Sequence, residues 1–200
     1  MKDLHETIKE ILNTRAPKKI ESPDPSYVHA SVLIPLFKEK GCHKVLFTER
    51  THRVEHHKGQ ISFPGGAADA DDASPLETAL REAHEEVGLQ KADVHILGRI
   101  DDTPTMSSNF VIHPFVGLIP HPYNFTVSEA EVHRLVKAPL SIFHPENTRN
   151  QRDSAEYGGV TYRTIAYEHK GDLIWGATAR MMQNLMDIIS HTLPLPREMK

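Results

Sequence analysis

Residues 81–89 read Arg-Glu-Ala-His-Glu-Glu-Val-Gly-Leu, and this stretch predicts more about the chain than any other. On a helix, side chains three and four positions apart share a face, so Glu82, Glu85 and Glu86 are expected to be neighbours. Like charges at this spacing destabilise a helix, and negative charge near its C-terminal end is also unfavourable. Local conflicts of this kind are expected at functional sites. A hard divalent cation such as Mg²⁺ would remove the conflict, because carboxylate oxygens are ligands it prefers.

A solvated acidic face is the simpler interpretation of three such glutamates, because charge runs usually lie on the surface. Two neighbouring features favour a site instead. Arg81 directly precedes the cluster, and an arginine can hold a carboxylate through two parallel hydrogen bonds. Upstream, residues 63–66 read Phe-Pro-Gly-Gly. Such a turn lets the backbone approach a metal ion or a phosphate without a Cβ in the way.

The helix that carries the glutamates is predicted over Pro75–Val87. Ser74 stands where an N-cap is expected, Pro75 at the first helical position and Glu77 two residues later, which together form a capping-box pattern. Gly88 is placed where a glycine commonly ends a helix. These local signals fix both ends of the helix.

The rest of the chain mixes strands and helices without strict alternation. Helical spacing of apolar residues predicts an amphipathic helix at 2–14, and three prolines make 16–26 a linker or extended arm. Strands are expected at 27–37, 44–48, 93–100, 110–119 and 160–167, a short helix at 128–136 and a closing helix at 175–191. The predicted fold is α/β of the α+β type, with a mixed sheet flanked by helices.

The chain of 200 residues is expected to form one domain over residues 27–200, preceded by the helix and arm of residues 1–26. Packing of the 2–14 helix on this domain is the simpler expectation for its apolar face. A homodimer contact through the same face is the alternative.

The composition is that of an ordinary soluble protein, with 38% hydrophobic and 25% charged residues. The net charge of −4 gives no global basic field, so no nucleic-acid partner is expected. The single cysteine, Cys42, excludes an intrachain disulfide and fits a reducing compartment. No apolar run approaches the ~18 residues that a membrane span needs. A cytoplasmic protein without a membrane partner is expected, and the fourteen histidines are interpreted as scattered surface residues.

The stretch from Gly66 to Leu89 resembles the Nudix box, whose pattern is Gly, five residues, Glu, seven residues, then Arg-Glu-apolar-x-Glu-Glu-x-Gly-apolar. Residues 81–89 match the second half in full. The first half departs, because Asp72 replaces the Glu and eight residues separate it from Arg81. The longer spacer resembles the coenzyme A pyrophosphatase branch of the family.

The resemblance implies a Nudix-type α/β/α sandwich and a metal-dependent enzyme acting on a small-molecule nucleotide substrate. The implied cofactor is Mg²⁺ or Mn²⁺, held by Glu82, Glu85 and Glu86, with the backbone carbonyl of Gly66 as a further ligand.

The residues ahead of the box sharpen the substrate class. Residues 46–51, Gly59 and residues 63–66 resemble the motif that marks coenzyme A pyrophosphatases, and residues 174–180 also resemble that branch. The motif has an Arg four residues before the glycine, where this chain has Glu55; Arg53 is a candidate replacement.

The resemblance therefore implies hydrolysis of the diphosphate linkage of coenzyme A or an acyl-CoA to (acyl-)phosphopantetheine and adenosine 3′,5′-bisphosphate. The alternative substrate is another nucleoside diphosphate derivative, such as a nucleotide sugar, NADH or a dinucleoside polyphosphate. Alternatives of another kind are a non-catalytic binding module and an RNA-decapping hydrolase, which would want a basic groove.

Hydrolysis also needs a general base and groups that hold phosphate. Glu82 or Glu85 on the box helix is one choice of base, and Glu131 is the other. The candidate catalytic set is Arg81, Glu82, Glu85 and Glu131. The candidate substrate-binding set is Arg50, Arg53, Lys58 and Gly65, for whose cations a plain surface role is the alternative.

Overall fold

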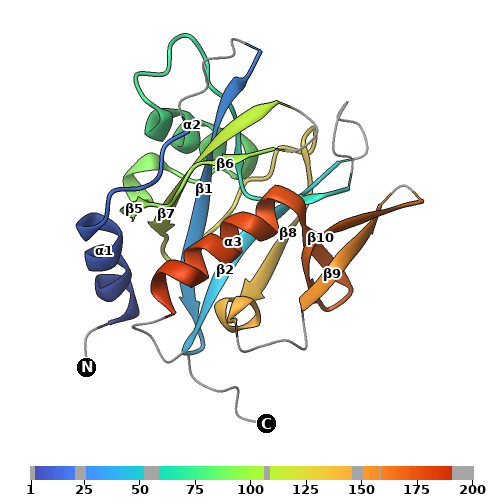
Figure 1. The fold of residues 1–200 in the computed structure, drawn as a ribbon. Helices are drawn as coiled ribbons and strands as arrows, with labels where there is room; N and C mark the ends of the chain where they lie inside the picture. Colours follow the sequence, from blue (N-terminus) through green and yellow to red (C-terminus); the bar gives the residue numbers. More distant parts are fainter. Residues whose placement is uncertain are drawn as a thin grey trace.

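The computed structural model describes residues 3–20, 26–51, 59–105, 109–145, 151–157 and 159–190. Within these ranges an eight-stranded mixed sheet forms the centre of the molecule (Figure 1). Its middle strands, β1 (Val28–Glu39) and β7 (Phe110–Leu118), run parallel from the pair Val28–Phe110 to the pair Leu36–Leu118. β1 therefore has a long strand beside it on each side, and its side chains serve both faces of the sheet.

The other strands of this sheet add to it in antiparallel orientation. They are β2 (Cys42–Arg50), β3 (Ile61–Ser62), β4 (Gly65–Ala67), β5 (His95–Arg99), β6 (Thr103–Pro104) and β8 (Val132–Pro139). The order is β3-β2-β1-β7-β5, while β4 pairs with β1, β6 with β7 and β8 with β2. A separate three-stranded sheet contains β9 (Gln151–Tyr157), β10 (Val160–His169) and β11 (Asp172–Trp175).

Helices cover both faces of the large sheet. On one face α1 (Leu4–Thr14) and α3 (Gly176–Ile189) share a core with Val32 and Ile34 of β1, and on the other α2 (Pro75–Val87) shares a core with Leu33 and Phe37. The alternation follows from the two-residue period of a strand. Two short 3₁₀ turns, η1 (Lys91–Asp93) and η2 (Leu140–Phe143), complete the elements described. The predicted α/β/α sandwich with a mixed sheet is confirmed.

The N-terminal helix packs on the sheet, as its amphipathic pattern indicates. Ile8 and Leu12 are buried in the core that α3 also covers. The segment after it is attached too, because the Asp101 carboxylate accepts hydrogen bonds from the Arg15 side chain and, at 2.8 Å, from the Lys18 backbone N–H. Packing on the domain therefore accounts for the apolar face of α1, and the homodimer stays a prediction.

The prediction of a helix at 128–136 is wrong. The backbone forms a single turn, in which the Val132 N–H donates to the Ser128 carbonyl at 2.9 Å, and the chain then continues as β8. Val136 and Ala138 are buried, whereas Lys137 between them is exposed, as in a strand with one covered face. The cap-like residues at 128–131 thus start a turn, and pairing with β2 makes the next segment a strand.

No helix in the described part of the chain is both long and apolar enough to span a membrane.

Candidate active site

The box helix begins and ends where the sequence predicts. The Ser74 hydroxyl accepts the Glu77 N–H at 3.3 Å, and Gly88 takes a left-handed conformation with φ of 70°. The Gly88 N–H donates to His84 O at 2.8 Å, which satisfies a terminal carbonyl. The Glu77 carboxylate does not complete a capping box and instead accepts from Lys91 at 2.7 Å. Both ends of α2 are thereby fixed, and with them the directions of its glutamates.

Arg81 organises the first half of the site. Its guanidinium donates twice to Asp72, from Nε at 3.0 Å and from Nη2 at 2.9 Å. It also donates to Glu82 at 2.9 Å, to Glu85 at 3.0 Å and to the Ala67 carbonyl at 3.2 Å. These hydrogen bonds hold the pKa of Asp72 far below its ordinary value and raise that of Arg81. The bidentate partner of Arg81 is therefore Asp72, and one cation relieves the repulsion between Glu82 and Glu85.

Glu86 lies in different surroundings. It is 1% exposed, and its Oε1 is 3.8 Å from Nη1 of Arg50 on β2. Its Oε2 and the Nε of Arg50 are both buried and have no hydrogen-bond partner among the described residues. Burial raises the pKa of Glu86 to about 8; Glu82 and Glu131 add to the rise, while Arg50 and the Gly65 backbone oppose it. A buried carboxylate with an unpaired oxygen is costly, and it indicates a missing ligand.

The glycine turn lies directly against the box helix. A Cβ added at Gly66 would stand 2.5 Å from the Cδ and Oε1 of Glu82. A Cβ at Gly65 would stand 2.4 Å from the Ser31 carbonyl oxygen. Both positions therefore need glycine, because β4 runs between β1 and the carboxylates of α2. Gly66 therefore lies against Glu82, and its carbonyl as a metal ligand stays a prediction.

Glu131 lies close to the glutamates of α2, in the turn that the structure forms where a helix was predicted at 128–136. The Ser128 N–H donates to Glu86 O at 2.9 Å, and the Thr51 N–H donates to Glu131 O at 2.9 Å. The turn is thus attached to the ends of α2 and β2. The pKa of Glu82 is raised, first by its burial and further by Glu85 and Glu131, while Arg81 opposes the rise.

The structure therefore brings together most of the residues singled out from the sequence. Those grouped around the end of α2 are Arg50, Gly65, Gly66, Arg81, Glu82, Glu85, Glu86 and Glu131. Arg53, Glu55 and Lys58 lie outside the described residues. Sequence reasoning missed the pairing of Asp72 with Arg81, although the box spacing already placed an acid at position 72.

The residues present fit a hard divalent cation. The donor set is carboxylates beside a backbone carbonyl, one carboxylate oxygen is buried without a partner among the described residues, and the lack of a side chain at Gly66 lets the turn lie directly against the Glu82 carboxylate. Such an arrangement defines a class of protein, a cation-dependent enzyme built on an α/β/α sandwich.

Comparison with known proteins gives the family. The model of the NUDIX domain matches residues 28–155, so the chain belongs to the NUDIX family. A Yersinia enterocolitica protein described as an uncharacterized Nudix hydrolase NudL is 39% identical over 163 residues, which cover 78% of this chain and 79% of the relative. A Yersinia pestis protein of the same description is 35% identical over 170 residues, covering 80% and 79%.

Solved structures agree on the fold. A Nudix hydrolase from M. Smegmatis, RenU, superposes with a TM-score of 0.55 at 16% identity, over 85% of this chain and 90% of its own. A MutT/nudix family protein from Enterococcus faecalis gives 0.56 at 12% identity, over 95% and 70%. Family membership makes the chain a Nudix hydrolase, an enzyme that cleaves pyrophosphate-containing substrates with divalent metal ions.

Proposed function

We propose that the chain hydrolyses the diphosphate linkage of coenzyme A or an acyl-CoA, with Mg²⁺ or Mn²⁺, to (acyl-)phosphopantetheine and adenosine 3′,5′-bisphosphate. The observation that carries the reaction type is the unpaired, buried Glu86 carboxylate beside Arg50. The substrate rests on the longer spacer between Asp72 and Arg81 and on the motif-like residues 46–51 and 63–66.

Four groups would hold the metal: the carboxylates of Glu82, Glu85 and Glu86 and the carbonyl of Gly66. Glu86 and Glu82 are the inner candidates, because burial raises the pKa of each and a bound cation would favour their charged forms. Glu85 has a side chain 53% exposed and lies toward solvent. When bound, the cation neutralises phosphate charge and lowers the pKa of the attacking water.

Arg81 acts as a positioning residue in this proposal. It is anchored by Asp72 and the Ala67 carbonyl, and from that anchor it fixes Glu82 and Glu85. Pre-set ligands of this kind need no reorganisation when the substrate arrives.

The substrate's phosphates would be held by cations on the β2 side of the site. Arg50 already lies beside Glu86, and its Nε has no partner among the described residues, so it has a donor to offer a phosphate oxygen. Arg53 and Lys58 come after β2 in the sequence and are proposed for the same task. Gly65 is proposed to offer its backbone to the substrate.

Glu131 is the general base that we favour over Glu82 and Glu85. Glu82 is half-buried and hydrogen-bonded to Arg81, and Glu85 is also engaged by Arg81. Glu131 is partly exposed and close enough to raise the pKa of Glu82 and Glu86. Its carboxylate would take the proton of the attacking water. Glu131→Gln should lower kcat by about 10²-fold to 10³-fold.

A substrate screen tests the proposal. Purified protein with Mg²⁺ or Mn²⁺ is incubated with coenzyme A, acetyl-CoA, NADH, a nucleotide sugar and a dinucleoside polyphosphate, and products are separated by chromatography. We expect coenzyme A or acetyl-CoA to give adenosine 3′,5′-bisphosphate and the matching phosphopantetheine. Intact coenzyme A alongside cleavage of another diphosphate would refute the substrate and keep the reaction type. If no substrate is cleaved, the non-catalytic binding module gains support.

A further inference from the structure

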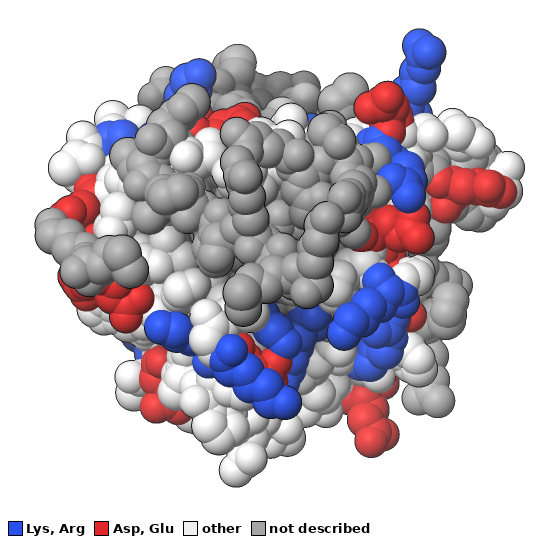
Figure 2. All heavy atoms as spheres, turned by 90° about the horizontal axis from the view of Figure 1, so that it is seen from below, with Lys and Arg blue, Asp and Glu red and all other residues white. Residues whose placement is uncertain are grey.

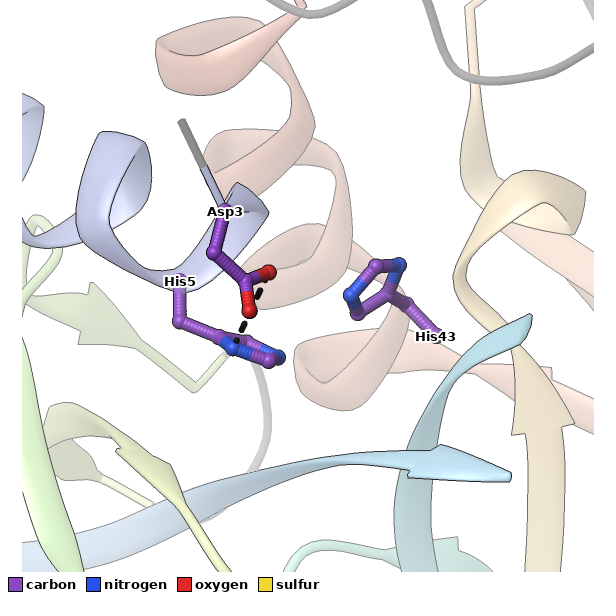
Figure 3. Close-up of side chains that lie close together, drawn as sticks. All are labelled: Asp3, His5 and His43. Carbon is purple, nitrogen blue, oxygen red and sulfur yellow. Dashed lines mark ion pairs between the residues drawn. The ribbon is translucent and has the colours of Figure 1, made fainter. Parts of the chain in front are cut away.

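The hairpin end of the large sheet carries a second group of metal-ligand side chains. Asp3 at the N-cap of α1, His5 in its first turn and His43 near the start of β2 each offer one ligand atom, and these atoms lie within 4.8 Å of one another (Figure 3). We propose that these three residues bind a transition-metal dication of the Zn²⁺ class, separately from the catalytic cation.

The contacts within the group leave two imidazole nitrogens free. Nδ1 of His5 is 3.4 Å from a carboxylate oxygen of Asp3, and the rings of His5 and His43 meet edge to face with centroids 5.0 Å apart. Nε2 of His5 and Nε2 of His43 are both buried, and neither has a hydrogen-bond partner within the described ranges. Buried polar atoms nearly always have a partner, so two unpaired nitrogens beside a carboxylate indicate a ligand that completes them.

Charged side chains of both signs lie around the group. Lys38 lies opposite His43 in the β1–β2 pairing and repels a cation, whereas the Asp3 carboxylate attracts one. Figure 2, seen from this end of the molecule, shows Lys and Arg close to Asp and Glu.

The donor types separate this site from the catalytic one. Two imidazoles and one carboxylate suit Zn²⁺, Co²⁺ or Ni²⁺, whereas Mg²⁺ prefers oxygen ligands and water. Ligands about 2.0–2.1 Å from a tetrahedral ion stand roughly 3.4 Å apart, so ligand atoms that lie within 4.8 Å of one another close by up to about 1.4 Å on binding. Asp3 has an exposed side chain at a helix terminus and is free to supply that closure. Three protein ligands leave the fourth position for water.

The site is distant from the box helix. His43 pairs with Lys38 of β1, whereas Gly66 pairs with Ser31 of the same strand. Ser31 and Lys38 are seven positions apart, which spans about 23 Å at roughly 3.3 Å per residue. A metal ion here would not touch the diphosphate. It would link the start of α1 to the β1–β2 hairpin, two segments that are far apart in the sequence. The link would stabilise the packing of α1 on the sheet.

Metal titration of the full chain tests the proposal. The titration uses the Glu86→Gln variant in excess Mg²⁺, so that Zn²⁺ or Co²⁺ binding at the catalytic site is suppressed. Zn²⁺ or Co²⁺ is then added, and the heat of binding, the visible absorption and the unfolding temperature are measured. We expect one equivalent of Zn²⁺ per chain, a higher unfolding temperature and, with Co²⁺, the strong visible absorption of a tetrahedral site. His5→Gln and His43→Gln, added separately, should each weaken binding by at least about tenfold, since loss of a ligand removes a metal–nitrogen bond.

Two controls make the result decisive. His133→Gln, on an exposed histidine of β8, and Cys42→Ser, on the exposed cysteine beside His43, should both keep the affinity. Circular dichroism of the two ligand variants separates lost binding from lost folding, and agreement between them guards against one variant misfolding. Equal Zn²⁺ binding by His5→Gln and the parent, or no saturable equivalent in the parent, would overturn the proposal.

Discussion

Arg81 and Glu86 stand five residues apart on the same helix, yet the structure satisfies their polar atoms to opposite degrees. Arg81 has partners in Asp72, Glu82 and Glu85 as well as a backbone carbonyl. Glu86 is more deeply buried, has one cation at 3.8 Å, and keeps an oxygen without a partner in the described part of the chain. The hydrogen bonds of Arg81 are therefore satisfied by the protein itself, whereas Glu86 still has an oxygen that a bound cation could satisfy. Substitutions at and around the two ends test this difference.

The largest effect is expected at Glu86. Glu86→Gln removes a charged ligand but keeps the shape, and a bound cation contributes several kcal/mol to catalysis. We expect kcat to fall by at least about 10³-fold, equivalent to about 4 kcal/mol. Steady-state kinetics with saturating Mg²⁺ measures it. Glu77→Gln, on a half-exposed acid of the same helix, should stay near the parent rate. Similar losses in both variants would mean that Glu86 has no special role.

The second effect is on stability against pH in the metal-free chain. Glu86 has a pKa of about 8 in the fold and an ordinary value of 4.5 when unfolded. The fold therefore binds more protons between these values, and the stability that protonated Glu86 contributes is present below pH 4.5 and lost as pH rises toward 8. Relative to Glu86→Gln, the free energy of unfolding should fall by about 3 kcal/mol between pH 5 and 8.

Denaturant unfolding in the presence of a chelator measures that difference. Addition of Mg²⁺ at pH 8 should raise the free energy of unfolding of the parent protein and leave that of the Glu86→Gln variant unchanged. Parallel pH profiles for the two proteins would contradict the assignment of the shift to Glu86.

The third effect is expected at the glycine turn. Gly66→Ala places a methyl group 2.5 Å from the Glu82 carboxylate, which must move away. We expect kcat to fall by about 10²-fold, since misplacement of a catalytic group by about 1 Å has an effect of that size. Gly171→Ala is the control, because nothing lies within 4 Å of an added Cβ there and only stability should suffer. Unchanged activity in Gly66→Ala would show that Glu82 tolerates displacement.

The smallest effect is expected at Arg81, whose hydrogen bonds are satisfied within the protein. Arg81→Lys keeps the charge but cannot make the paired hydrogen bonds to Asp72 while also contacting both glutamates. We expect a loss of about 2 kcal/mol in the free energy of unfolding, below the roughly 3–5 kcal/mol of a fully buried pair because the side chain is 26% exposed. Lys91→Ala breaks the exposed pair with Glu77 and should cost less than about 0.5 kcal/mol. Equal losses would deny Arg81 its anchoring role.

The box helix was predictable in both position and bounds because its signals are local. Ser74, Pro75 and Gly88 determine where it starts and stops from within a few residues of each end. The segment at 128–136 was not predictable in this way. Its cap-like residues are compatible with either a turn or a helix, and the choice depends on its pairing with β2, a strand from a distant part of the sequence.

The site was predictable to a similar extent. The three glutamates and Gly66 fit a pattern within one stretch, whereas the neighbour of Glu86 depends on how β2 and α2 approach each other in space. The grouping of Asp3, His5 and His43 was not predictable for the same reason, because His5 and His43 are far apart in the sequence and come together only in the fold. The sequence contains fourteen histidines, and nothing in their spacing predicts that the rings of His5 and His43 come into contact.

The fixed ends of α2 also constrain how the length of this part of the chain can vary among its relatives. A helix repeats every 3.6 residues, so one residue inserted between Ser74 and Gly88 turns every later side chain by about 100°. An insertion ahead of Arg81 would thus turn Glu86 away from Arg50 and Arg81 away from Asp72. Residues 68–71 are exposed and precede the cap, so a change of length there leaves the glutamates in place. Insertions and deletions that survive selection should therefore fall before Ser74, outside the helix that holds the carboxylates.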